Sequence, residues 1–202
     1  MTTFAEKCNS IFNHAINDYH LTDNIDTPIN NPFTPQTIEN ILYLKCWIDT
    51  VQWHLEDIVR DPEIDPVLAL QIKRRIDRSN QDRTDLVERI DSYFYEQYKN
   101  IKPLVSAKIN TESPAWAVDR LSILNLKIYH MEAETNRQDI SQEQHNSVTE
   151  KLKTLNEQKH DLTLSITQLL DDYASGDRIM RVYRQMKMYN DPNLNPVLYQ
   201  KK

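Results

Sequence analysis

The chain has 202 residues, of which 39% are hydrophobic and 27% are charged, and its formal net charge is −6 at pH 7. This length is enough for one domain with a sizeable core, and the composition is ordinary for a protein with a polar surface. Because the basic residues are scattered along an acidic chain, we expect no nucleic-acid partner.

Glycine is nearly absent, and Gly176 is the only one in the sequence. Hairpin turns and phosphate-binding loops need residues at positive φ, where glycine is the usual choice. The sequence therefore predicts an all-α fold, and it excludes the dinucleotide fingerprint and the P-loop.

The two cysteines, Cys8 and Cys46, lie far apart without metal-type spacing. Both fall in helical patterns, so we expect two reduced, partly buried thiols. No apolar run approaches the roughly 18 residues of a membrane span, and residues 1–13 lack the apolar region of a signal peptide. These features predict a cytoplasmic protein.

Apolar residues at helical spacing predict an N-terminal helix over residues 4–19. A second helix is expected to start at Thr34-Pro35, where threonine caps and the missing N–H of proline costs nothing, and to stop before Pro62.

Asp65-Pro66 repeats this start signal for a third helix that continues to about residue 99. The connection between the second and third helices is short, so the two must be antiparallel neighbours.

A second helical hairpin is expected to follow. Ser113-Pro114 starts its first helix, Ser141 with Gln144 forms a capping box for its second, and Gly176 ends that second helix in the left-handed conformation.

A short basic helix over residues 178–189 is expected next, followed by an Asn/Pro-rich tail. We predict an antiparallel four-helix bundle of two hairpins with these two extra helices, as one domain over residues 1–190 with a tail over residues 191–202.

The two hairpins carry signs of an internal duplication. With an offset of 76 residues, His54 matches His130, Asn80 matches Asn156, and the cap Asp65 matches the cap Ser141. A shared helical register would also produce the apolar matches, so a common origin is one of two open explanations.

The stretch from Trp53 to Pro62 combines an aromatic ring, an imidazole and several charges. Residues two apart on a helix point to opposite sides, so His54 cannot share an ion with Glu56 and is expected to act with Asp57 and Trp47. Glu56 instead faces Arg60. A metal site there would need a ligand from another helix, such as Asp77, His130 or His160. The simpler interpretation is a hydrogen-bonded histidine at the boundary of the apolar stripe. We therefore assign no metal or cofactor.

The inner faces of the third and fifth helices are interrupted by Arg83 and Lys159, with Asn80 and Asn156 beside them. A buried cation must be paired, so each needs an acidic partner or an anionic ligand. We expect Arg83 either to snorkel or pair with Asp57, Asp77 or Asp85, or to receive a phosphate or carboxylate in a pocket inside the bundle. Glu88 and Asp91, together with Glu56 and Asp57, also resemble the magnesium-binding carboxylate pairs of all-helical nucleotide pyrophosphatases, although Arg60 stands where that pattern has a second glutamate.

Residues 53–91 resemble an uncharacterised bacterial family with a domain of unknown function, family number 4254. The matching positions are Trp53-His54, Glu56-Asp57, Arg60, Lys73-Arg74, Ile76-Asp77, Asn80-Gln81, Arg83, Asp85, Glu88 and Ile90-Asp91. The resemblance implies an all-helical cytoplasmic protein whose genes often lie near cell-envelope glycosyltransferases, and it implies no activity.

Three functions stay open at this point. The first is a binding or accessory protein for envelope-glycan synthesis, whose partner is a glycosyltransferase or a phosphorylated small molecule. The second is an enzyme acting on a phosphorylated metabolite, with His54 as acid/base, Asp57 orienting it and Arg83 on the phosphate. The third is a metal-dependent hydrolase. The candidate binding residues are Trp47, Trp53, Glu56, Arg60, Asp77, Asn80, Arg83, Asn156 and Lys159, and the oligomeric state is left open.

Overall fold

In the computed structural model, which describes residues 2–186, 188 and 191–200, the regular elements are helices and no strand occurs among these residues. They are α1 (Phe4–His20), α2 (Ile38–Val59), α3 (Pro66–Tyr98), α4 (Pro114–Thr135), α5 (Gln142–Ser175) and α6 (Pro196–Tyr199). The prediction of an all-α fold is confirmed.

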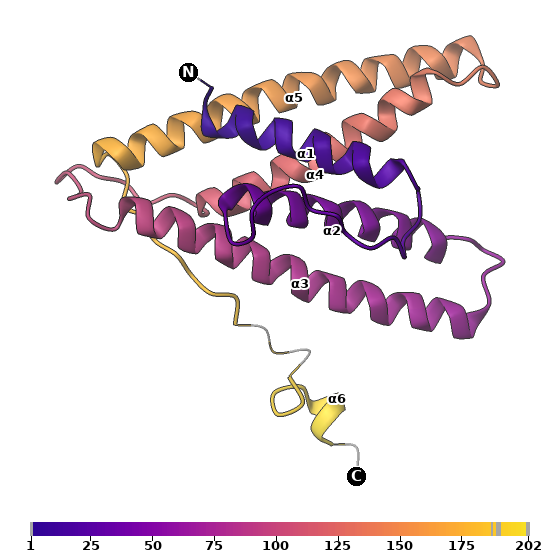
Figure 1. Cartoon of the computed structure of the whole chain (residues 1–202), viewed down its shortest axis with the longest axis horizontal. Helices are drawn as coiled ribbons and strands as arrows, with labels where there is room; N and C mark the ends of the chain where they lie inside the picture. The colour runs from indigo at the N-terminus through magenta and orange to yellow at the C-terminus, as the bar shows by residue number, and fades with distance from the viewer. Residues whose placement is uncertain (1, 187, 189–190, 201–202) are drawn as a thin grey trace.

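Two antiparallel hairpins form the bundle, α2 with α3 and α4 with α5, and α1 packs against α2, α4 and α5 (Figure 1). The N-terminal helix is therefore part of the core and not an addition to its outside. One face of α1 is buried completely or almost so, through Ala5, Cys8, Ile11, Phe12, Ala15, Ile16 and Tyr19. Burial raises the pKa of the Cys8 and Cys46 thiols, and both are free.

The start of α2 differs from the prediction. Thr37, and not Thr34, caps the helix, because its side chain accepts a hydrogen bond of 3.2 Å from the N–H of Asn40. Gln36 has φ of 70°, which interrupts a right-handed helix, so Thr34-Pro35 forms a turn before α2 and not its first turn.

The other helix boundaries follow the predicted signals. Asp65 accepts hydrogen bonds of 3.0 and 2.9 Å from the N–H groups of Val67 and Leu68. Ser141 and Gln144 form the predicted capping box at the start of α5, and Gly176 ends that helix with φ of 83°. The helix bounds also match under the offset of 76 residues: Ile38–Val59 maps onto Pro114–Thr135, and α3 begins where α5 does.

The predicted basic helix over residues 178–189 is wrong for the part of that range that the structure describes, residues 178–186 and 188. Residues 187 and 189 lie outside the described residues. The chain is extended there because Asp177 and Ile179 form backbone hydrogen bonds of 3.0 Å with Lys108, which draws it along the 104–110 loop. Farther on, Arg184 pairs with Glu88 of α3 at 2.6 Å. The only helix that follows within the described tail is the four-residue α6, which lies apart from the bundle in Figure 1.

None of the helices in the described ranges combines the length and the apolar character needed to cross a bilayer.

Replacing Gly176 by alanine should destabilise the fold. A Cβ at this position would lie 2.9 Å from the carbonyl oxygen of Lys102, and the residue would have to keep a positive φ. Left-handed backbone costs an L-residue about 1–2 kcal/mol, so urea unfolding should show at least that loss of stability for Gly176→Ala. The control is Thr154→Ala on the exposed side of α5, and equal stability of the two variants would contradict the argument.

Candidate functional site

Four charged side chains meet between α2, α3 and α4 and form what we call the ionic cluster: Lys45, Asp49, Arg83 and Asp119. Lys45 and Asp49 have fully buried side chains, one turn apart on α2, and their charges are in contact. Nζ of Lys45 also lies 2.9 Å from Oδ1 of Asp119. Arg83 completes the set, with Nε at 3.0 Å from Oδ1 of Asp49 and Nη2 at 2.5 Å from Oδ2 of Asp119.

The ionic cluster contains two positive and two negative groups, so it carries no net charge. Burial raises the pKa of the Asp49 carboxyl, and Lys45 and Arg83 act in the opposite direction. Ser122 donates a hydrogen bond of 2.6 Å to Asp49. Nε of Arg83 is close to Asp49 without a well-aligned hydrogen bond, so that contact is best described as an ion pair.

The acidic partners of Arg83 are therefore not the predicted ones. Asp57, Asp77 and Asp85 were expected, whereas Asp49 and Asp119 hold the guanidinium. Both acids lie on the sides of α2 and α4 that face α3, so they reach Arg83 inside the bundle. Since Nε and Nη2 are both engaged, the guanidinium no longer offers a bidentate edge made of these two nitrogens to an anion.

A cleft of about 580 Å³ opens above the ionic cluster, and we call it the Trp53 cleft. Its lining residues are Asp49, Gln52, Trp53, Glu56, Asp57, Arg60, Arg83 and Ile123. The first six of these residues, from Asp49 to the C-cap residue Arg60, lie along one face of α2, because positions three and four apart on a helix lie together.

The polar side chains of the cleft are held by short contacts. Gln52 donates a hydrogen bond of 2.9 Å to Asn80 and accepts one of 3.1 Å from Ser79. Arg60 lies 3.3 Å from Asp57 and 3.8 Å from Glu56 at the solvent side. Asn80 therefore supports the cleft through Gln52 without lining it.

His54 lies on another side of α2 and joins His20 of α1 and His130 of α4 in what we call the histidine cluster. One ring nitrogen from each of the three lies within 4.8 Å of the others. Nε2 of His54 is 3.3 Å from Nε2 of His20. Nδ1 of His20 is 2.7 Å from the carbonyl oxygen of Ile16, so this nitrogen must be the donor.

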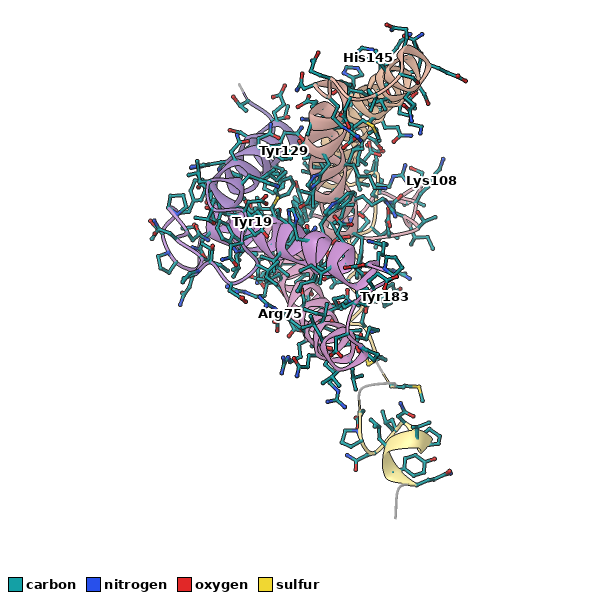
Figure 2. The ribbon with its side chains drawn as sticks, turned by 90° about the vertical axis from the view of Figure 1, so that its right-hand side faces the viewer. Tyr19, Arg75, Lys108, Tyr129, His145 and Tyr183 are labelled. Atoms are coloured by element: carbon teal, nitrogen blue, oxygen red, sulfur yellow. The ribbon has the colours of Figure 1, made fainter. Side chains whose placement is uncertain are left out.

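Each imidazole of the histidine cluster is stacked on an aromatic ring. Tyr19 lies on His54 at 5.0 Å between centroids, Tyr129 on His20 at 4.2 Å, and Trp53 on His130 at 4.7 Å. Figure 2 labels Tyr19 and Tyr129, and it shows His145 far away at the tip of the α4–α5 hairpin. Trp53 therefore lies between the histidine cluster, where it stacks on His130, and the Trp53 cleft, where it forms part of the lining.

The surroundings of the histidine cluster favour neutral rings. Burial lowers the pKa of His130 to about 4, and the neighbouring His54 and His20 act in the same direction. Burial also lowers the pKa of His54, while Asp23 and Asp57 oppose the shift. Within the part of the chain that the structure describes, no hydrogen-bond partner reaches the buried Nε2 of His130.

A comparison with protein families matches residues 39–182 to a family described as "Protein of unknown function (DUF4254)". The chain belongs to this family. No curated protein and no solved structure matches the chain. The matched residues of this family contain the Trp53 cleft, the ionic cluster, His54 and His130, whereas His20 and Asp23 precede them.

The structure brings together only some of the residues singled out in the sequence. Trp53, Glu56, Asp57, Arg60 and Arg83 share the Trp53 cleft, and Asn80 lies beneath it. Trp47 is buried in the main core. Asp77 pairs with Lys73 on the surface of α3, and Asn156 is exposed on α5.

The remaining predicted positions also lie apart from the cleft. Lys159 is partly buried on α5, where burial lowers its pKa and Glu132 opposes the shift. Glu88 pairs with Arg184, and Asp91 is buried beside Ser113 and Ala115 at the start of α4. Burial raises the pKa of the Asp91 carboxyl more than these two neighbours lower it. Glu88 and Asp91 do not line the Trp53 cleft with Glu56 and Asp57.

Sequence reasoning missed Lys45, Asp49, Asp119 and His20. The available signal for the first three was their position within strongly apolar helices, where a charge needs a partner. His20 ends α1 and follows an apolar pattern that gave no reason to single it out.

Removing the Arg83 charge should destabilise the protein strongly. Arg83→Met keeps much of the side-chain volume but leaves two aspartates facing one lysine, and breaking a buried ion pair costs about 3–5 kcal/mol. Urea unfolding of Arg83→Met should show a loss in this range. Arg74→Met, on the exposed side of the same helix, is the matched control. Equal effects of the two substitutions would mean that the ionic cluster contributes little to stability.

Proposed function

We propose that this protein is a cytoplasmic binding or accessory protein for cell-envelope glycan synthesis, and that its ligand occupies the Trp53 cleft. The observation that carries the proposal is the lining of that cleft, in which an indole ring stands beside carboxylates, an amide and a guanidinium. The resemblance to a family whose genes often lie near envelope glycosyltransferases supplies the biological setting.

The chemistry of the lining favours a ligand rich in hydroxyl groups. A hydroxyl both donates and accepts hydrogen bonds, so it is satisfied by carboxylates that accept and by a guanidinium that donates. Trp53 provides an apolar ring against which the carbon face of a sugar can pack, and ligand pockets typically combine such a surface with a few polar groups. We therefore expect a saccharide.

A phosphate on that saccharide would meet Arg60. Arg83 is held by Asp49 and Asp119, whereas Arg60 has a side chain that is 65% exposed and pairs only with groups at the solvent side. A sugar phosphate or a sugar nucleotide is thus compatible with the cleft, with its anionic part at the rim and its sugar against Trp53.

The acid–base enzyme alternative requires His54, Asp57 and Arg83 to act on one bound molecule. His54 belongs to the histidine cluster, Asp57 lines the cleft, and Arg83 is engaged in the ionic cluster. This distribution favours the binding protein over that enzyme.

Binding can be measured by isothermal titration with maltose, glucose-1-phosphate and UDP-glucose as probes. Glu56→Ala should weaken binding of all probes that bind by about 10- to 150-fold, because a hydrogen bond to a charged group contributes about 1.5–3 kcal/mol. Arg60→Ala should weaken only the two phosphate-bearing probes. Glu63→Ala and Arg74→Ala are exposed controls with the same charge changes. The proposal fails if no probe binds, or if the cleft variants bind as tightly as the controls.

The proposed protein partner is a glycosyltransferase encoded beside this protein. Co-expression of the two chains should give one complex in size-exclusion chromatography, in a ratio that scattering measurements can define. Separate elution of the two proteins at micromolar concentrations would remove this partner and leave the ligand proposal to the titrations.

A further inference from the structure

The histidine cluster brings three imidazoles together, which a single hydrogen-bonded histidine at the edge of the core does not require. His20, His54 and His130 come from three different helices, α1, α2 and α4, and they place one ring nitrogen each within 4.8 Å of the other two. We propose that these three imidazoles bind a divalent transition-metal ion, with zinc as the first candidate. The inference is independent of the Trp53 cleft and of its ligand.

The spacing of the nitrogens fits such an ion. Zinc–imidazole bonds are about 2.0–2.1 Å long, so two nitrogens on a tetrahedral zinc lie about 3.3–3.4 Å apart. Nε2 of His20 and Nε2 of His54 are 3.3 Å apart. The ligand nitrogen of His130 is within 4.8 Å of both, so a rotation that moves it by about an ångström completes three corners of a tetrahedron.

The orientation of His20 is the one that metal-binding imidazoles use. Its Nδ1–H donates to the carbonyl oxygen of Ile16 at 2.7 Å, which leaves Nε2 of the neutral ring with its lone pair toward His54. A hydrogen bond from the second ring nitrogen to a backbone carbonyl fixes both tautomer and ring plane in metal sites. Without an ion, the short contact to His54 requires the proton of the neutral His54 ring on Nε2, and metal binding through Nε2 requires the other tautomer, with that proton on Nδ1.

The other contacts hold the rings without satisfying them. Tyr19, Tyr129 and Trp53 stack on the three imidazoles and restrict their rotation. Nε2 of His130 is buried and has no hydrogen-bond partner among the described residues. A buried unsatisfied polar atom costs about 1–3 kcal/mol. If His130 has a purely structural role, the free-energy cost of its unsatisfied nitrogen remains. If the ring rotates toward a bound ion, the ion becomes a partner for the nitrogens of the histidine cluster.

Charge and ligand type indicate the class of ion. Asp23 lies 3.7 Å from Nε2 of His54 through Oδ1, and both Asp23 and Asp57 act on His54 and His130 as negative neighbours. This field favours a cation. Imidazole nitrogens suit zinc, copper, nickel and iron, whereas magnesium and calcium prefer oxygen ligands. Three histidines also leave one position for Asp23 or water, as in catalytic zinc sites.

The test uses full-length protein without a histidine tag, stripped of metal with a chelator and titrated with Zn²⁺ by calorimetry. We expect one zinc ion per chain. His20→Ala, His54→Ala and His130→Ala should each weaken binding by about 100-fold, because each removes a ligand, and loss of an outer-shell contact alone costs about 10–100-fold. His145→Ala is the matched control, on a histidine far from the cluster (Figure 2).

Sub-stoichiometric zinc binding by the wild-type protein overturns the proposal, as does undiminished binding by the His130→Ala protein. A second measurement needs no variant: metal-free wild-type protein titrated with Co²⁺ should gain the intense visible absorption of tetrahedral cobalt, and zinc should displace it. A weak octahedral spectrum contradicts a three-imidazole site. Saccharide titrations repeated in chelator separate this result from the cleft, because cleft binding is expected to persist without metal.

Discussion

The arrangement of α2, α3 and α4 depends on one buried electrostatic interaction. Lys45 and Asp49 on α2, Arg83 on α3 and Asp119 on α4 can be buried together because their charges cancel. Removing any one member leaves an uncompensated buried charge. The free-energy cost of that charge is larger than the stability that the intact cluster contributes. The positions of the three helices are therefore linked, and the floor of the Trp53 cleft is fixed by the same contacts that fix the bundle.

Helix α2 carries both candidate sites because it is enclosed by α1, α3 and α4. Successive residues of a helix are turned by about 100°. Trp53 consequently faces the cleft and the ring of His130, while the next residue, His54, faces Tyr19 and His20 of α1. One turn of α2 thus forms the wall between the two sites. The indole of Trp53 is the side chain that belongs to both.

Much of the fold could be predicted from local signals. Caps such as Asp65 and Ser141, and the single glycine at residue 176, act within a few residues of themselves, so the sequence alone indicates where α3 and α5 begin and where α5 ends. The start of α2 was misplaced because Thr34 and Thr37 both satisfy the capping rule, and only the positive φ of Gln36 separates them. The predicted basic helix does not form over the described residues 178–186 and 188, because the chain there pairs with a distant loop through hydrogen bonds of Asp177 and Ile179 with Lys108.

The sites were less predictable because they depend on contacts between helices. The sequence required an acidic partner for Arg83 but could not choose among many aspartates. Helix α2 is buried by three neighbouring helices, which enclose Lys45 and Asp49 together with its apolar residues. His54 was singled out by its local motif. His20, which completes its surroundings, has no such motif and is brought to it only by the packing of α1 against α2.

The matching bounds of the two hairpins give a physical reason why His54 and His130 meet. They stand at matching positions under the offset of 76 residues, one on α2 and one on α4, and these two helices contact each other so that the ring centroids lie 5.5 Å apart. The ionic cluster does not repeat, because Asn125 stands at the position that matches Asp49, and Lys159, near the middle of α5, stands at the position that matches Arg83. Helix α1 has no counterpart either, and it contributes the third imidazole. The set of three histidines therefore forms where His54 and His130, at matching positions of α2 and α4, meet His20 of α1.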